Sequence, residues 1–214
     1  MKAMRTRVMM KCRKAPGYIA ALIIALMVFG DASAKTPSRV KDPELVKVEL
    51  LDLELLDQDG RKVKFRSEVI GDRIVVINTF YTACTTVCPA LIYIFVELQE
   101  LLGEYLGREV VLVSLSVDPR TDTPLRLKEF ARKQKAKPGW VFLTGDRDNL
   151  SRVLLGLDAY SLKIDEHPVM TIIGDNKTGW KRFYGFAGPR QLMKHIAALI
   201  EERKSAALQQ KGRS

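Results

Sequence analysis

Stretches of continuous apolar residues alternate along the chain with segments whose apolar residues recur at helical spacing. Residues 73–80 (RIVVINTF) and 109–117 (EVVLVSLSV) are nearly continuous apolar runs, a pattern typical of strands buried on both faces of a sheet. Between them, residues 89–102 carry an apolar stripe at helical spacing behind a first-turn proline, which predicts a helix. This central stretch therefore predicts a β-α-β unit with parallel strands.

Further elements are predicted on either side of this unit. Upstream, residues 46–56 and 61–65 form the arms of a β-hairpin around the turn 57–60. Downstream, Thr123-Pro124 combines an N-cap residue with a first-turn proline. The later elements are a helix to about Gln134, a strand at 140–143, a helix at 146–157, a strand at 169–174, its hairpin partner at 180–184 and a final amphipathic helix from Pro189 to Arg203.

The order of these elements defines the fold class. Alternating strands and helices imply a central α/β sheet flanked by helices, and the C-terminal hairpin makes that sheet mixed. A β-α-β half followed by a β-β-α half is the thioredoxin arrangement, here with insertions and an N-terminal β-hairpin. Ligands of such sheets bind beyond the carboxyl ends of the strands. The segment in that place is 80–89.

Residues 1–34 have the pattern of an export signal. A basic stretch precedes an apolar run of twelve residues, Tyr18 to Phe29, which is short against the roughly 20 residues that a transmembrane helix needs. Ala32-Ser33-Ala34 then supplies a small-x-small cleavage pattern. We expect cleavage after Ala34 and a location in the periplasm or at the outer face of the cytoplasmic membrane. The alternative is an uncleaved anchor that tethers the protein to the membrane.

The remaining chain divides into a polar linker at 35–44, one domain at 45–203 and a polar tail at 204–214. Half of the formal net charge of +10 lies within residues 1–34, which leaves a modest +5 for the rest. The basic residues Lys133, Lys135 and Lys137 fall in a predicted helix end and loop, where a solvated surface explains them better than nucleic-acid binding. We therefore expect no nucleic-acid partner.

Two cysteines remain after the expected cleavage, because Cys12 leaves with the signal. Cys84 and Cys88 lie between a predicted buried strand and a helix start, where amide N–H groups favour a thiolate. At this spacing the pair can form a disulfide, act as a redox couple or bind a soft metal such as Cu(I). The alternative is that both are small buried hydrophobic residues.

The two histidines differ in their predicted surroundings. His195 lies inside the final amphipathic helix and has the pattern of an ordinary helix residue. His167 lies in the loop before the predicted strand 169–174, which packs beside the cysteine loop in a thioredoxin arrangement. Its imidazole can complete a site of two cysteines and one histidine, or tune a thiolate electrostatically. Taken alone, a loop histidine is more often solvated.

Several stretches resemble segments of the Sco/SenC family, and the resemblance covers roughly residues 45–203. They are VVINTFYTACTTVCPALIYIFVEL, VLVSLSVDPRTDTPLRLKEFA, WVFLTGDRDNLSRVL and the His167 loop with its hairpin. The resemblance implies a thioredoxin-like fold at the outer face of a membrane. It also implies that the protein delivers copper to the dinuclear copper centre of cytochrome c oxidase, reduces that centre's cysteines, or does both.

The resemblance also assigns roles to single residues. Cys84 and Cys88 match the family's cysteine ligands and His167 its histidine ligand, for a copper ion held as Cu(I) or Cu(II). Asp118 matches a family residue near the site, although an acid that caps a turn is an equally good interpretation. The implied partner is the copper-centre subunit of cytochrome c oxidase, or another envelope protein that receives copper or carries a disulfide.

One departure from the family pattern favours a second function. We expect Ser or Thr after the histidine, and the chain has Pro168, which resembles the cis-proline of thioredoxins. This favours a thiol-disulfide oxidoreductase of the cell envelope that uses Cys84 and Cys88 without metal. A thiol peroxidase is a weaker alternative, since Thr85 stands three residues before Cys88 but the proline expected before it is missing.

Overall fold

The computed structural model describes residues 43–211 of the chain. The predicted export signal, its cleavage site and most of the polar linker lie outside these residues. Within residues 43–211, none of the helices combines the length and the apolar character needed to span a bilayer.

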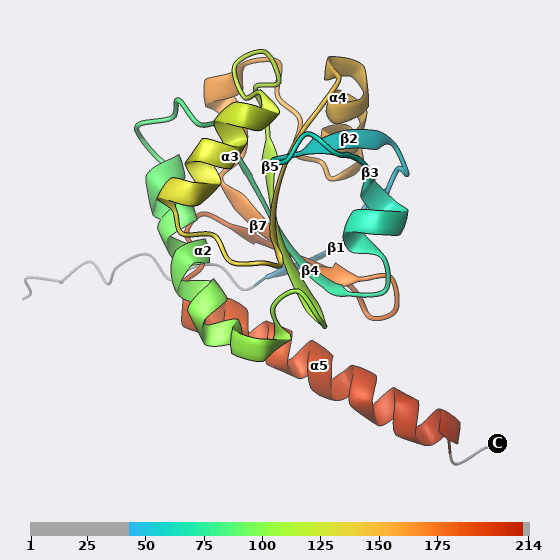
Figure 1. Cartoon of the computed structure of the whole chain (residues 1–214). Coiled ribbons are helices and arrows are strands. Elements are labelled where there is room, and N and C mark those ends of the chain that lie inside the picture. The colour runs from blue at the N-terminus through green and yellow to red at the C-terminus, as the bar shows by residue number, and fades with distance from the viewer. Residues whose placement is uncertain (1–42, 212–214) are drawn as a thin grey trace, which may run out of the picture. The chain divides into compact units, whose positions relative to one another are not determined.

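One eight-stranded sheet forms the centre of the domain (Figure 1), in the order β1-β8-β7-β4-β5-β6-β2-β3. Strands β4, β5 and β6 are parallel, and the remaining pairs are antiparallel. The predicted mixed α/β sheet is therefore confirmed. The strands are β1 (Glu44–Val46), β2 (Glu54–Asp57), β3 (Lys62–Lys64), β4 (Ile74–Phe80), β5 (Val110–Ser116), β6 (Trp140–Thr144), β7 (Met170–Asp175) and β8 (Gly179–Tyr184).

Helices cover both faces of this sheet. Every residue of β4 and of β5 is buried, because each strand sends alternate side chains into two separate apolar clusters. One cluster includes side chains of α2, α3 and α5, and the other includes side chains of α4 and η1. The helices are α2 (Cys88–Leu102), α3 (Pro124–Lys133), α4 (Arg147–Gly156) and α5 (Pro189–Lys211), with short turns η1 (Phe65–Ile70), η2 (Gly103–Tyr105) and η3 (Ile164–Glu166).

The predicted cap of α3 is confirmed, and α4 has a side-chain cap of the same kind. Thr123 Oγ1 accepts a hydrogen bond from the Arg126 N–H at 3.4 Å, and α3 begins at the following proline. Asp146 Oδ1 accepts from the Asp148 N–H at 2.9 Å at the start of α4. These bonds satisfy N–H groups that have no partner inside the first turn of a helix.

The N-terminal hairpin is shorter than predicted. Within the predicted first arm only the β2 residues 54–56 pair with β3, whereas β1 pairs with β8 at the other edge of the sheet. The chain between β1 and β2 has no regular structure, and its apolar residues pack against the cluster on the α4 side. The Glu49 N–H donates to the carbonyl of Gly156 at 2.8 Å. A contact with the end of α4 thus replaces the predicted strand pairing.

The final helix is longer than predicted. Helix α5 continues to Lys211, so that residues 204–211 are helical although the sequence pattern predicts a polar tail. Residues 204–210 are exposed, and the loss of the apolar stripe makes the segment look like a tail. Its Ala, Leu, Gln and Lys residues have high intrinsic helix propensity and no Gly or Pro interrupts them, which explains the continuation.

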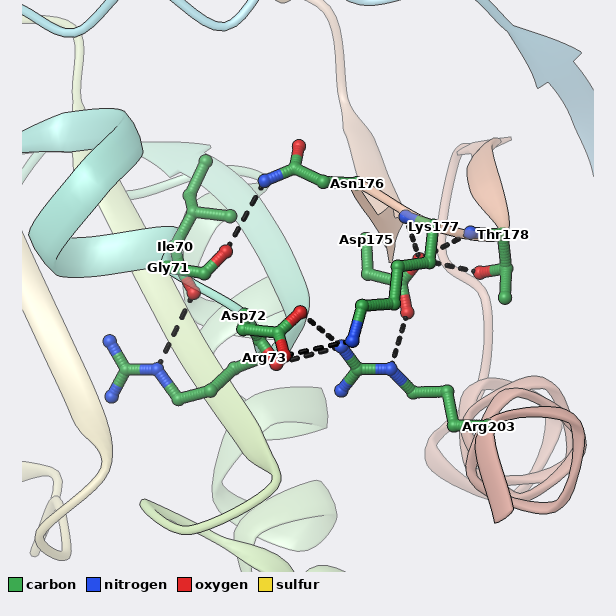
Figure 2. Close-up of polar contacts among 9 residues, drawn as sticks. All are labelled: Ile70, Gly71, Asp72, Arg73, Asp175, Asn176, Lys177, Thr178 and Arg203. Atoms are coloured by element: carbon green, nitrogen blue, oxygen red, sulfur yellow. Dashed lines mark hydrogen bonds and ion pairs between the residues drawn. The ribbon is translucent and has the colours of Figure 1, made fainter. Parts of the chain in front are cut away.

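A polar cluster fixes α5 to the end of the sheet (Figure 2). Arg203 Nε lies 3.0 Å from Asp175 Oδ2, and Arg203 Nη2 lies 3.0 Å from Asp72 Oδ1. Asp175 is fully buried and also accepts hydrogen bonds from Lys177 and Thr178. Asp72 precedes β4 and Asp175 ends β7. The cluster therefore stabilises the sheet end opposite the cysteine loop, which follows β4.

Candidate thiol and metal site

The two cysteines meet at the start of α2, as predicted. Strand β4 ends at Phe80 and α2 begins at Cys88, so residues 81–87 form a loop at the carboxyl end of a central parallel strand. No side chain of the N-cap residue bonds to this helix start. Instead, the backbone N–H of Cys88 donates to Cys84 Sγ over 3.4 Å. A sulfur thus takes the place of a capping oxygen.

The surroundings of the two sulfurs separate their pKa values. Burial opposes ionisation of Cys84, but hydrogen bonds from Cys88 and Thr86 outweigh it and lower the pKa to about 6. Burial raises the pKa of Cys88 to about 12, together with the hydrogen bond to Cys84 and the charges of Cys84 and Asp122. Cys84 is therefore a thiolate at neutral pH, and Cys88 remains a thiol.

Both sulfurs are largely covered by protein. The exposed fraction is 9% for Cys84 and 2% for Cys88, and neither residue forms a disulfide. Because Cys88 is the more buried thiol and has the raised pKa, it does not have the properties of a peroxide-reducing cysteine. The geometry disfavours the thiol peroxidase alternative.

Asp122 holds the cysteine loop in place, and the sequence analysis did not identify it. Its fully buried carboxylate accepts hydrogen bonds from the hydroxyl and the N–H of Thr82. It also accepts from the Ser116 hydroxyl at 2.6 Å. Thr82 lies two residues before Cys84, so Asp122 links the end of β5 to the sulfurs. The only sequence signal for Asp122 was its position directly before the Thr123 cap. That position fits an acid that caps a helix as well as an acid that anchors the cysteine loop.

Asp118 caps a turn, which is one of the two roles considered for it from the sequence. Its carbonyl accepts hydrogen bonds from the N–H groups of Thr121 and Asp122. Its carboxylate Oδ1 also accepts from the Thr121 N–H at 3.3 Å. Asp118 therefore shapes the turn that presents Asp122.

His167 is buried at the end of η3, with one ring nitrogen bonded and the other bare. Its Nδ1 lies 2.6 Å from the carbonyl oxygen of Ile164. Because a carbonyl only accepts, Nδ1 must carry the hydrogen, and Nε2 of the neutral ring then carries the lone pair. Among the described residues, nothing forms a hydrogen bond to the buried Nε2. A histidine that binds a metal usually has this arrangement, with its other ring N–H donated to a carbonyl.

The imidazole does not join the sulfurs in this conformation. Cys84 and Cys88 line a cavity of about 380 Å³ together with Tyr81, whereas His167 lines a different cavity of about 230 Å³ with Asp118. In the part of the chain that the structure describes, no three side chains of His, Cys, Asp or Glu are gathered to hold a metal ion. The structure therefore brings two of the three predicted ligands together.

Tyr81 touches both halves of the predicted site. Its ring meets the His167 ring edge-on, with 5.8 Å between the centroids. Its hydrogen bond to Cys84, and then burial, raise the pKa of the Tyr81 hydroxyl to about 12. Tyr81 is therefore the side chain through which the imidazole and the sulfurs are in contact.

The resemblance of Pro168 to a cis-proline is wrong. All peptide bonds within residues 43–211 are trans. His167 adopts an extended backbone with φ −62° and ψ 144°, which is the region that a residue before proline prefers. The Pro168 carbonyl accepts a hydrogen bond from Thr79 at 3.4 Å. This bond ties the His167 loop to β4.

His195 belongs to the packing of α5. Its ring meets that of Phe183 edge-on at 5.0 Å between centroids. Burial lowers the pKa of His195, and the neighbouring charges of Lys181 and Lys194 lower it further. This agrees with its interpretation as an ordinary helix residue.

The fold and site together define a thioredoxin-like protein with a Cys-x-x-x-Cys pair at a helix start and a buried histidine that contacts Tyr81 of the cysteine loop. The sequence profile of the SCO1/SenC family matches residues 47–201. The chain therefore belongs to the SCO1/SenC family.

Relatives and solved structures agree with this assignment. An SCO2-like protein of Rickettsia conorii is 26% identical over 156 residues, covering 68% of this chain and 74% of its own. The structure of BsSco, described as a member of the Sco family of cytochrome c oxidase assembly proteins with a disulfide switch, is 24% identical with a TM-score of 0.61, covering 74% of this chain and 96% of its own. The structure of Bradyrhizobium japonicum ScoI with copper bound is 21% identical with a TM-score of 0.57, covering 75% and 99%. The two structures confirm the fold.

Proposed function

We propose that this protein is exported and binds a copper ion through Cys84, Cys88 and His167. It delivers the copper to the dinuclear copper centre of cytochrome c oxidase, reduces the cysteines of that centre, or does both, at the outer face of the cytoplasmic membrane or in the periplasm. Membership of the SCO1/SenC family supports this proposal. The description of a similar structure as copper-bound, and of another as belonging to cytochrome c oxidase assembly proteins, supports it further.

The observation that carries the copper proposal is the bare Nε2 of His167. An unpaired buried nitrogen costs free energy, on the order of 1–3 kcal/mol, and a metal bond at its lone pair would remove that cost. The two sulfurs, which lie on the other side of Tyr81, are soft donors, and one is already a thiolate at neutral pH. Two sulfurs and one imidazole nitrogen suit copper in either of its common oxidation states.

Binding through all three ligands requires a local rearrangement. The His167 ring rests against Tyr81 and lines a separate cavity from the sulfurs. A shift of the short segment η3, or a rotation of Tyr81, would bring Nε2 towards the sulfurs. The segment around His167 is short and its preceding residues are exposed, so few packing contacts oppose such a shift.

A specific observation favours reduction of a partner disulfide as a second activity. The pKa values near 6 and 12 assign Cys84 as the attacking thiolate and Cys88 as the resolving thiol. Cys84 would attack one partner sulfur and release the other as a thiolate. Cys88 would then lose its proton to the released thiolate and attack Cys84, which forms the Cys84–Cys88 disulfide and frees the second partner sulfur as a thiolate. Two electrons pass to the partner.

Anaerobic copper titration of the reduced protein tests the copper proposal. We expect one copper ion per chain in the unchanged protein, and weaker binding for Cys84→Ala, Cys88→Ala and His167→Ala. His195→Ala is the matched control, since that imidazole packs against Phe183, and it should bind copper like the unchanged protein. Equal affinities for His167→Ala and His195→Ala would contradict the proposed ligand set.

A further inference from the structure

A groove runs beside Cys84 on the surface formed by α2 and α3. The cavity next to the sulfurs is lined by residues of both helices, including Ile92, Tyr93 and Phe130. A second cavity of about 380 Å³ shares Phe130 and Lys133 with the first. It continues along α3 to Thr82, which belongs to the cysteine loop. The two cavities therefore adjoin, and together they are called the groove; the part between α2 and α3 is lined by Cys84.

The groove combines an apolar floor with a basic rim. Ile92 and Phe130 belong to the apolar cluster beneath it, and Tyr93 stands at its edge with 62% of its surface exposed. The charged residues that line the groove are Arg126, Glu129, Lys133 and Lys135. Three cations and one carboxylate therefore give the rim of the groove a net positive charge.

The chemistry of Cys84 requires a partner on this surface. Exchange of a disulfide brings a partner sulfur within bonding distance of Cys84 Sγ, and transfer of copper requires a partner ligand to reach an ion that Cys84 would hold. Cys84 is 91% covered, and the groove is a cavity that it lines. The partner segment that carries the sulfur must therefore lie in or along this groove.

We propose that the groove is a docking site for a partner polypeptide in which apolar side chains adjoin the cysteines and acidic side chains flank them. The proposal rests on the proposed function, whose partner it characterises. Apolar neighbours of the cysteines fill the floor beside Ile92 and Phe130. The acidic flanks pair with Lys133, Lys135 and Arg126. This charge complementarity increases the rate of association and favours acidic partners over basic ones.

Binding of two synthetic peptides to the full-length protein tests the docking site without using thiol or copper chemistry. Both peptides carry the same apolar core with Ser in place of Cys, and they differ only in Asp or Lys flanks. NMR titration gives the dissociation constants. We expect the acidic peptide to bind about tenfold more tightly, because each of the three rim cations contributes a small free energy to its binding. We expect this preference to shrink at high salt, since exposed charges are screened.

Matched lysines on α3 give the decisive control. Lys133 and Lys128 are 61% and 63% exposed, and each forms one ion pair at 3.0 Å, with Glu129 and Asp59. Lys133 lines the groove and Lys128 lines neither cavity. Lys133→Glu should weaken binding of the acidic peptide about fivefold, whereas Lys128→Glu should leave it within twofold.

The apolar floor has its own pair of variants on α2. Tyr93→Ser should weaken both peptides, because Tyr93 lines the groove, and Leu101→Ser should not, because this exposed residue lies outside it. Equal binding of the acidic and basic peptides, or equal effects of Lys133→Glu and Lys128→Glu, would overturn the docking proposal and leave the copper proposal intact. If His167→Ala loses copper binding while the unchanged protein binds both peptides equally, the copper proposal stands and the docking proposal fails.

Discussion

The backbone N–H of Cys88 donates a hydrogen bond to Cys84 Sγ across 3.4 Å, at a helix start that has no side-chain cap. This contact makes the two cysteines unequal together with the hydrogen bonds of Thr86 to Cys84 and the deeper burial of Cys88. The sulfur that accepts gains negative charge stabilised by the first turn of α2, and the cysteine that donates is drawn into the core. The chemistry expected of the pair follows from this asymmetry.

Alkylation of the reduced protein should show this inequality. The Cys84 thiolate persists above its pKa of about 6 and is protonated below it, so that the rate of reaction with iodoacetamide should rise through pH 6 and level off near pH 7. Peptide mass mapping should place the first modification on Cys84, since Cys88 stays protonated up to about pH 12. A midpoint between pH 8 and 9 would contradict the asymmetry.

Two threonines of the loop provide a matched control for this experiment. Thr86 donates a hydrogen bond to Cys84 and Thr85 does not, although both are exposed. Thr86→Val should raise the midpoint by up to about one pH unit, since a hydrogen bond to a charged group contributes about 1.5 kcal/mol. Thr85→Val should leave it unchanged.

Removal of the Asp122 carboxylate should destabilise the domain and loosen the cysteine loop. Asp122→Ala leaves Thr82 and Ser116 without their buried acceptor, and we expect a loss of about 3 kcal/mol in the free energy of unfolding. Urea denaturation measures it. Asp118→Ala is the control, because Asp118 caps a partly exposed turn and should cost about 1 kcal/mol. Equal losses would contradict the role assigned to Asp122.

The ion cluster at the opposite end of the sheet should contribute to stability alone. Arg203→Ala deprives the buried carboxylate of Asp175 of its counter-ion (Figure 2), and we expect a loss of about 2–3 kcal/mol. The adjacent Lys204 forms an exposed pair with Glu201 and lies over the Tyr105 ring at 5.9 Å, so Lys204→Ala should cost under about 1 kcal/mol. Copper affinity should be the same in both variants. A changed affinity would show that this cluster acts on the site.

Export is tested by the mass of the protein isolated from the cell envelope. Cleavage after Ala34 would leave a chain that begins at Lys35. A chain that retains residues 1–34 and fractionates with the membrane would instead identify these residues as an anchor. Recovery of the protein from the cytoplasm would contradict both interpretations.

The sequence predicts those parts of the fold whose signals are local. The apolar runs of β4 and β5, the stripe of α2 and the caps at Thr123 and Asp146 each depend on residues close together in the chain. The missed features depend on distant contacts. The first part of the predicted hairpin arm 46–56 does not pair as a strand, because Glu49 contacts Gly156 instead. No local sequence pattern reveals this contact.

The site shows the same division between local and distant information. The cysteines meet because a strand and a helix adjoin them in the chain. The burial of Asp122 depends on Thr82, forty residues away, and its carboxylate looks like any turn residue in the sequence. The place of His167 relative to the sulfurs depends on how Tyr81 packs between two loops.

X-ray absorption spectroscopy of the copper-loaded protein tests the central claim most directly. We predict a copper ion coordinated by two sulfur atoms and one imidazole nitrogen, and loss of the imidazole scattering in His167→Ala but not in His195→Ala. An unchanged spectrum in His167→Ala would remove the imidazole from the ligand set. The bare Nε2 of His167 would then have no part in binding, and Cys84 and Cys88 would act as a dithiol alone.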